Sequence, residues 1–371
     1  MADVLVVGCG LIGASVGMVL QQAGRDVVLH DESPAAVGDS VRRRAGRPWD
    51  GSESVRLALV AVPPRLTAPV LTQLQALDIA RTYTHVASVQ SQVQREIEAV
   101  SSDLSSVIGG HPLAGRERSG PSAATSDLFV GRPWAVCASS ASSATAHEDL
   151  LELIADVGAD AVALSADAHD AAVAVLSHLP QLVSSALAAG LAGDQRLADD
   201  AEARRLAGPG VVDTTRLAAS DPDLWVQILE LNAAQVAPVA RAVGERITAA
   251  AAALDTLAGT ASAPAQAQAV AVLRDLLRLG NDGRALVPVK RGVKEAAFAP
   301  VRITVSDEPG RLAALLTDAG AAGVNVEDVH LEHVPGRPTG VIELLVARPE
   351  VARLAHALGQ VGWLVQDDED R

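Results

Sequence analysis

One histidine stands in a setting that suits proton transfer. His111 lies in the stretch VIGGHPLAGRERSG, residues 107–120, directly after a glycine pair and before a proline. An imidazole has a pKa near neutrality, so it can accept the proton of a hydroxyl group as a hydride leaves the same carbon. The two glycines would let a ligand approach closely. A structural or surface histidine is the alternative that the spacing alone leaves open.

A glycine-rich turn near the N-terminus predicts a dinucleotide site. The motif G-x-G-x-x-G follows an apolar run at 3–8 and opens an expected helix at 11–23. Its first glycine allows a tight turn, its second lets the backbone approach a pyrophosphate, and its third lets helix and strand pack closely. The start of the helix supplies amide donors for phosphate oxygens. The cofactor-binding residues expected here are Gly8, Gly10, Leu11, Ile12 and Gly13.

An acidic residue favours NAD as the dinucleotide. Asp31 ends the second expected strand, where a carboxylate can accept hydrogen bonds from both ribose hydroxyls and would repel a 2'-phosphate. Arg42, Arg43 and Arg44 lie close enough in sequence to keep NADP open. The alternative is a glycine-rich turn in an α/β protein that binds no dinucleotide.

Alternating strands and helices around these residues predict a Rossmann-like, doubly wound α/β domain over 1–165. Ligands bind such folds at the carboxyl ends of the strands, and His111 directly follows one of them. The expected strands are 3–8, 26–31, 56–63, 84–89, 106–110, 132–139 and 160–165, and the expected helices are 11–23, 65–77, 91–100 and 145–157.

The rest of the chain divides into three further segments. Residues 166–257 lack strand signals and predict an all-helical domain for substrate binding and dimerisation. Its uncharged stretch 171–193 approaches the length of a membrane span, but we interpret it as a helix buried in the domain or in an intertwined homodimer. A helical boundary segment and linker follow at 258–299. Residues 300–367 have the order βαββαβ, which predicts a small ferredoxin-like unit.

Composition excludes several classes of protein. The net charge of −15 and the pI of about 5.0 argue against a nucleic-acid partner, because binding phosphates needs clustered Lys and Arg. No secretory signal precedes the first strand, and two cysteines are too few for a disulfide framework, so we expect a cytoplasmic protein without membrane attachment. The nine histidines and two cysteines form no compact ligand set in the sequence, so we expect no metal.

Four motifs in order resemble the prephenate dehydrogenase family. They are GCGLIGASVG from Gly8, GGHPLAGRERSG around His111, HDAAVAVLSHLPQ at 169–181 and DTTRLAASDPDLW at 213–225. Two later stretches, DEPGRL and GVNVEDVHLEH, resemble an ACT regulatory domain, so the likeness covers nearly the whole chain. The resemblance implies NAD-dependent oxidative decarboxylation of prephenate to 4-hydroxyphenylpyruvate in tyrosine biosynthesis.

The resemblance also assigns roles close to the reacting carbon. It makes His111 the acceptor of the ring hydroxyl proton and places Ser88 near that histidine and the nicotinamide. The family commonly has an acidic residue where His85 stands and a lysine where Gln90 stands, so this chain departs from the pattern beside Ser88. A serine that caps the helix beginning near residue 91 is the alternative for Ser88.

A second set of residues matches positions that hold the substrate in the family. Arg216 can offer two parallel donors to a carboxylate, and Asp213 could orient it across one helical turn. Glu117 matches a position near the side-chain end of the substrate. His178 and Gln181 match positions that line the active site, although many members carry a second histidine at the latter.

Regular helical spacing predicts which residues of the third motif lie on the same side of the helix. Asp170 and Ser177 are seven positions apart and are expected to share one side of the helix. For His169 and His178 a hydrogen-bonded place in the core is the alternative to a role in the active site.

The ACT-like stretches suggest regulation by an amino acid. Asp307, Gly310 and Asn325 match the signature that binds amino acids where two such domains pair, and tyrosine, the end product of the pathway, is the expected effector. A purely structural ACT domain is the alternative.

Two other functions compete with prephenate dehydrogenase. Arogenate dehydrogenase has the same chemistry on a substrate with an amino-acid side chain, and no residue here distinguishes the two. An amino-acid-sensing binding protein with an inactive dehydrogenase core belongs to another class, and the presence of both His111 and Arg216 argues against it. Homoserine dehydrogenase lacks the GGHPLAG and SHLPQ motifs.

Overall fold

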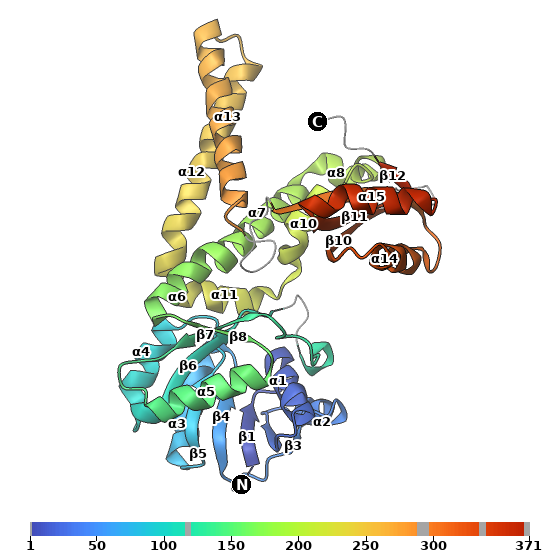
Figure 1. Cartoon of the computed structure of the whole chain (residues 1–371). Helices are drawn as coiled ribbons and strands as arrows, with labels where there is room; N and C mark the ends of the chain where they lie inside the picture. The colour runs from blue at the N-terminus through green and yellow to red at the C-terminus, as the bar shows by residue number, and fades with distance from the viewer. Residues whose placement is uncertain (1, 116–119, 288–296, 334–338, 367–371) are drawn as a thin grey trace. The chain divides into compact units, whose positions relative to one another are not determined.

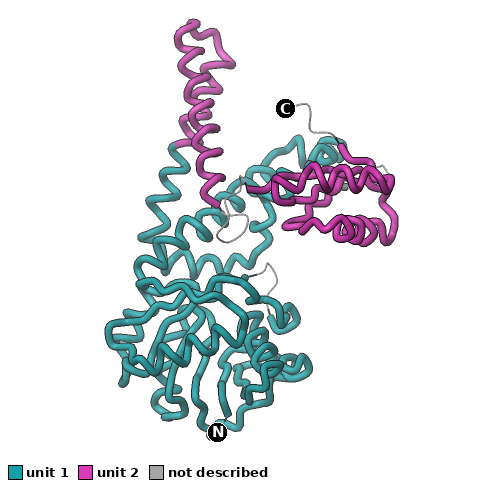
Figure 2. The backbone as a smooth tube through the Cα atoms, viewed as in Figure 1, with its two compact units in different colours: residues 1–245 teal, residues 246–371 magenta. Residues whose placement is uncertain are grey.

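The computed structural model forms two compact units, residues 1–245 and 246–371 (Figure 2). The structure describes residues 2–115, 120–287, 297–333 and 339–366.

Unit 1 is built on an eight-stranded sheet in the order β3-β2-β1-β4-β5-β6-β7-β8 (Figure 1). Neighbouring strands are parallel except for the antiparallel pair β6 and β7. The order 3-2-1-4-5-6 is that of doubly wound nucleotide-binding folds. The strands are β1 Ala2–Val7, β2 Val27–His30, β3 Arg47–Pro48, β4 Val55–Val60, β5 Ala80–His85, β6 Val107–Pro112, β7 Pro133–Cys137 and β8 Asp160–Ala163.

Helices cover both faces of this sheet, as the predicted doubly wound fold requires. Val4 and Val6 of β1 pack into a core with α1 and α5, whereas Leu5 and Val7 pack into a second core with α3 and α4. Successive side chains of a strand point to opposite faces, so both faces of β1 are buried. The helices are α1 Leu11–Gln22, α2 Pro34–Arg42, α3 Pro64–Ala76, α4 Ser91–Val100 and α5 Ala144–Asp156.

Three details of the sheet differ from the sequence prediction. The strand predicted at 84–89 lies at Ala80–His85 instead: β5 ends level with the end of β4, and 86–90 is a loop. The apolar Val86 and Val89 in that loop produced the error. The short β3 was not predicted. β7 runs antiparallel to β6, and the described residues between them, 113–115 and 120–132, contain no α-helix of the kind that a parallel crossover uses.

Unit 1 continues into the predicted helical segment. One helical run, Ala166–Gly193, is long and apolar enough to cross a membrane by length and composition alone; a core helix passes the same test. Within this run, a π-helical turn, Ala174–His178, separates α6 from α7. The helices are α6 Ala166–Val173, α7 Leu179–Gly193, α8 Gln195–Asp199, α9 Ala201–Arg204, α10 Pro209–Thr215, α11 Pro222–Leu231 and α12 Ala233–Ala258, the last of which extends beyond residue 245.

Unit 2 contains a four-stranded antiparallel sheet in the order β10-β11-β9-β12. Alternate residues of β9, such as Val301 and Ile303, pack on α14 and α15, which cover one face. The predicted βαββαβ order is present. The elements of this unit are α13 Ala263–Arg284, β9 Phe298–Ser306, α14 Arg311–Ala321, β10 Val326–His333, β11 Thr339–Ala347, α15 Val351–Gln360 and β12 Leu364–Gln366.

The glycine-rich turn between β1 and α1 has the geometry that its sequence predicts. Gly8 has φ +101°, and a Cβ there would lie 2.4 Å from the carbonyl oxygen of Ala61. A Cβ on Gly13 would lie 2.0 Å from the carbonyl oxygen of Gly8, so helix and strand could not pack as closely. A Cβ on Gly10 would meet nothing within 4 Å. Two of the three glycines are therefore required by the fold itself.

We expect Gly13→Ala to destabilise the protein by about 2 kcal/mol, because the added methyl group must push α1 away from β1. Gly38→Ala is the matched control: Gly38 lies inside α2 with no close backbone neighbour, so alanine should stabilise the helix by roughly 0.5–1 kcal/mol. Chemical denaturation of both variants measures these changes. Equal stability of Gly13→Ala and the unchanged protein would contradict the close packing.

Candidate active site

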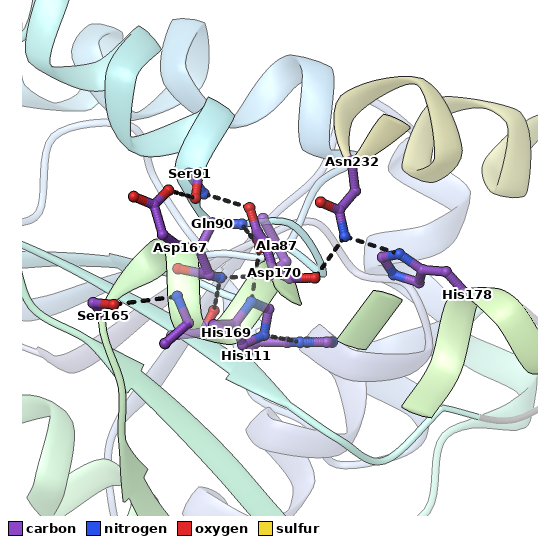
Figure 3. A network of polar contacts seen from close by, with 12 residues as sticks. Ala87, Gln90, Ser91, His111, Ser165, Asp167, His169, Asp170, His178 and Asn232 are labelled. Atoms are coloured by element: carbon purple, nitrogen blue, oxygen red, sulfur yellow. Dashed lines mark hydrogen bonds and ion pairs between the residues drawn. The ribbon is translucent and has the colours of Figure 1, made fainter. Parts of the chain in front are cut away.

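His111 is the outer member of a hydrogen-bonded chain of three side chains (Figure 3). It lies on β6, and its Nδ1 is 2.9 Å from Nε2 of His169 on α6. The Nδ1 of His169 is in turn 2.8 Å from Oδ1 of Asp170. His169 and Asp170 are 1% and 2% exposed, whereas His111 is only partly buried. The member of the chain that a ligand can reach is therefore His111.

The carboxylate of Asp170 is fixed by the N-terminus of α4. Its Oδ1 accepts a hydrogen bond from the backbone amide of Gln90 and its Oδ2 accepts one from that of Ser91, each at 2.8 Å. Burial alone would raise the pKa of Asp170, but the hydrogen bonds from His169 and the two amides outweigh burial and lower it. This helix is capped from α6, so the alternative in which Ser88 caps it is wrong.

Three histidines around this chain are held in their neutral form. Burial lowers the pKa of His111 from about 6.5 to about 3, and the neighbouring His169 and His178 contribute. Burial likewise lowers the pKa of His85 and that of His178 to about 4. An imidazole that is uncharged at neutral pH has a lone pair free to accept a proton. At neutral pH the lone pair of His111 is therefore available for a hydrogen bond from a ligand.

The π-helical turn decides which residues of the third motif face this chain. It adds one residue to the turn, so positions eight apart, rather than seven, share a side of the helix. Asn232 Nδ2 donates to the carbonyl oxygen of Asp170 at 2.9 Å and lies 3.1 Å from Nδ1 of His178. His178 is 1% exposed, whereas Ser177 is half-buried. The prediction that Asp170 shares its face with Ser177 is therefore wrong.

Gln181 holds the turn that carries Arg216. Its Nε2 donates to the carbonyl oxygen of Leu217 at 2.9 Å, and Ser184 Oγ accepts from the amide of Ala218 at 3.2 Å. These contacts dock the 3-10 turn Arg216–Ala219 on α7. Arg216 and Asp213 are both exposed, at the start of this turn and in the helix before it.

Gln90 occupies the position where the resembling family commonly has lysine. Its Nε2 donates to the carbonyl oxygens of Ala87 at 2.6 Å and Gly110 at 3.1 Å, joining the loop after β5 to β6. A Cβ on Gly109 would lie 2.5 Å from Gln90 Oε1. Gly109, two residues before His111, therefore leaves room for the side chain of Gln90. Ser88 lies half-buried in the same loop.

The carboxylate of Asp31 anchors the glycine-rich turn. Its Oδ2 accepts from the amide of Cys9 at 2.7 Å and its Oδ1 from the amide of Ser33 at 2.8 Å. Two of the nearby arginines have protein partners: Arg42 pairs with Asp39, and Arg43 donates to the carbonyl oxygens of Ser122 and Ala124.

The remaining predicted site residues lie elsewhere. Glu117 falls outside the described residues. In unit 2, Gly310, with φ +88°, begins α14 just after Asp307, whereas Asn325 follows the end of that helix. The structure thus places the predicted effector residues at opposite ends of α14 rather than together. Within the described part of the chain, no group of three or more His, Cys, Asp and Glu side chains could hold a metal ion.

Sequence reasoning missed four residues of the site: His169 and Asp170 as partners of His111, Asn232, and Gln90 as a hydrogen-bonding link. The adjacent His-Asp pair was the available signal, because an imidazole beside a carboxylate is a common orienting arrangement. Asn232 gave no comparable signal, since an asparagine at the end of a helix usually serves as a cap.

Two family models match this chain over most of unit 1. The nucleotide-binding domain of prephenate dehydrogenase matches residues 16–163, and the dimerization domain of the same enzyme matches residues 165–260.

Individual proteins agree with these matches. The protein named Probable prephenate dehydrogenase NovF of Streptomyces niveus is 36% identical over 98% of this chain and 99% of its own length. Cyclohexadienyl dehydrogenase of Zymomonas mobilis is 29% identical over 64% of this chain and 83% of its own. The crystal structure of prephenate dehydrogenase from A. aeolicus, in complex with hydroxyphenyl propionate and NAD+, shares the fold with a TM-score of 0.63 at 22% identity, covering 76% of this chain and 98% of that one. The chain belongs to the prephenate dehydrogenase family.

Proposed function

We propose that this chain catalyses the NAD-dependent oxidative decarboxylation of prephenate to 4-hydroxyphenylpyruvate, in tyrosine biosynthesis. The observation that carries the proposal is the partly exposed, neutral His111 at the carboxyl edge of the sheet, backed by His169 and Asp170. A group in this place can take the proton of a hydroxyl as hydride leaves the same carbon. Loss of carbon dioxide then makes the ring aromatic, which drives the reaction forward.

NAD fits the residues around the glycine-rich turn, and when bound it supplies the acceptor for the hydride. The open space at Gly10 leaves room for a pyrophosphate, and the first amides of α1, including those of Leu11 and Ile12, provide donors. Asp31 keeps further lone pairs for ribose hydroxyls beyond the two bonds it already accepts. NADP is disfavoured by this carboxylate and by the protein partners of Arg42 and Arg43.

Arg216 is proposed to bind a carboxylate of the substrate. It is exposed on the turn that Gln181 docks against α7, and a guanidinium can form two parallel hydrogen bonds with a carboxylate. Asp213 and Glu117 are proposed to help orient the arginine and the side-chain end of the substrate. His178 and Gln181 are proposed to shape the wall of the site, and Ser88 to lie near the nicotinamide.

The proposed assembly follows the four predicted segments: a Rossmann-like domain at 1–165, a helical substrate and dimerisation domain at 166–257, a linker at 258–299 and an ACT domain at 300–367. We propose a cytoplasmic homodimer formed through the second segment. Tyrosine is the proposed effector, and because Gly310 and Asn325 lie at opposite ends of α14, its site would need residues from two ACT domains.

Arogenate is the second candidate substrate, since a relative of this chain is a cyclohexadienyl dehydrogenase. NADH absorbance, measured with prephenate and with arogenate, tests both. We expect NADH to form with prephenate and NAD, and turnover with NADP to be much slower. No NADH with either substrate and either cofactor would contradict the proposed function and favour the amino-acid sensor.

We expect His111→Asn to lower kcat by roughly 100-fold or more, because asparagine cannot take up a proton, while NAD affinity stays nearly unchanged. Steady-state kinetics and NAD titration by fluorescence measure the two effects. His147→Asn is the control, since His147 lies on α5 away from the chain of three side chains. Unchanged turnover in His111→Asn would remove its assignment as the base.

We expect Arg216→Ala to raise the prephenate KM by roughly 10-fold or more, as loss of a charged hydrogen-bonding partner does, with a smaller effect on kcat. Arg205→Ala is matched to it: Arg205 is also exposed in the helical segment and pairs with Glu202. A normal KM in Arg216→Ala, or the same KM change in both variants, would assign the residue to structure instead.

A further inference from the structure

The hydrogen bonds of Asp170 determine which nitrogen of each histidine carries a proton. An ionised carboxylate only accepts hydrogen bonds, so Nδ1 of His169 must donate to it. In the neutral form of His169, Nε2 then carries no proton and can only accept from Nδ1 of His111. The Nε2 of His111 is therefore unprotonated. The nitrogen of His111 that is free to act as a base is Nε2.

A positive charge on His111 is disfavoured by its surroundings. Burial and the nearby His169, His178 and His85 all lower the pKa of His111, and only the electrostatic effect of Asp170 acts in the other direction. His169, by contrast, makes a direct 2.8 Å contact with the carboxylate of Asp170. A charge-assisted hydrogen bond of this kind stabilises an imidazolium more than a neutral imidazole.

We propose that the substrate's hydroxyl proton does not remain on His111 but is relayed, so that the positive charge comes to rest on His169 against Asp170. The proposal rests on the proposed function, because it needs a substrate hydroxyl that loses its proton as hydride departs. His169 does not touch the substrate, so it is a positioning residue that accepts a proton through His111.

The relay moves two protons in one direction. The substrate O–H bond breaks and a new N–H bond forms at Nε2 of His111, while the Nδ1–H bond of His111 breaks and a new one forms at Nε2 of His169. The hydroxyl carbon loses its hydride to NAD and becomes a carbonyl, and the ring C–CO2 bond breaks to complete the aromatic ring. His111 exchanges one neutral tautomer for the other, and His169 becomes an imidazolium. As the C–CO2 bond breaks, its electron pair completes the ring and leaves the former hydroxyl oxygen as a phenolate. The same proton steps in reverse then return the proton from His169 through His111 to that oxygen, which gives 4-hydroxyphenylpyruvate.

The charged and titratable groups that face His169 are consistent with His169 as the acceptor of the proton. His111 and His85 approach from the sheet, His178 from the helical run, and Asp170 is adjacent. The nearby Asp167 is exposed and accepts from the hydroxyl of Ser91 instead. Asp170 is thus the group that balances a charge on His169.

A proton inventory on the unchanged enzyme tests the relay without any substitution. Single-turnover hydride transfer is followed as NADH absorbance in mixtures of H2O and D2O, at a pH on the plateau of the rate profile. Two protons in motion give a curved dependence of the rate on the deuterium fraction, whereas one proton gives a straight line. We expect a curve. A straight line, or no solvent isotope effect, would overturn the relay.

His169→Gln supplies the second test, because its amide oxygen can accept from Nδ1 of His111 but cannot take up a proton. We expect hydride transfer to slow by roughly 100-fold, the inventory to become straight, and NAD affinity and melting temperature to stay close to normal. Asp167→Asn, on the same helix and outside the chain, should keep the normal rate and the curved inventory. A rate in His169→Gln within about threefold of normal, or a curve that persists, would overturn the proposal.

The outcomes separate the relay from the function on which it rests. Normal turnover of prephenate with a straight inventory refutes the relay and leaves the dehydrogenase intact. If His169→Gln fails to fold, the proton inventory of the unchanged enzyme still shows whether one proton or two move during hydride transfer. Absence of NADH with both prephenate and arogenate refutes the proposed function itself.

Discussion

The site depends on one contact, between the carboxylate of Asp170 and the N-terminus of α4. Two backbone amides and the imidazole of His169 converge on this buried carboxylate. The helix dipole and the amides stabilise its negative charge, so it costs little to bury. The contact joins the helical segment to the nucleotide-binding sheet. Without it His169 would have no fixed tautomer, and the basic nitrogen of His111 would be undefined.

The surrounding elements serve to bring these groups to one place. The π-helical turn moves His178 onto the side of Asp170, where Asn232 links the two. On the other side, Gln90 ties the loop after β5 to β6 and closes the space behind Gly109. An exposed histidine titrates near neutral pH, whereas burial lowers the pKa of His111 and keeps its imidazole uncharged at that pH.

Local features of the sequence were sufficient to predict much of the fold and part of the site. The glycine-rich turn was predictable because Gly8 and Gly13 answer a need for a positive φ or a close approach, and because strand, turn and helix follow one another directly. Alternating apolar runs predicted the layered sheet, and the position of His111 after a strand predicted that it lies at the carboxyl edge. The motif resemblance, not periodicity, supplied the reaction.

Only the tertiary structure decided what surrounds the histidine. His111 and His169 are 58 positions apart, and Gln90 and Asp170 are 80 apart, so no local pattern pairs them. The π-helical turn changed the face that regular helical spacing assigns to Ser177, and β7 pairs antiparallel with β6. Hydrogen bonds between distant segments are stronger where packing keeps water away from them, and the partners of a buried carboxylate are the donors that the fold brings to it.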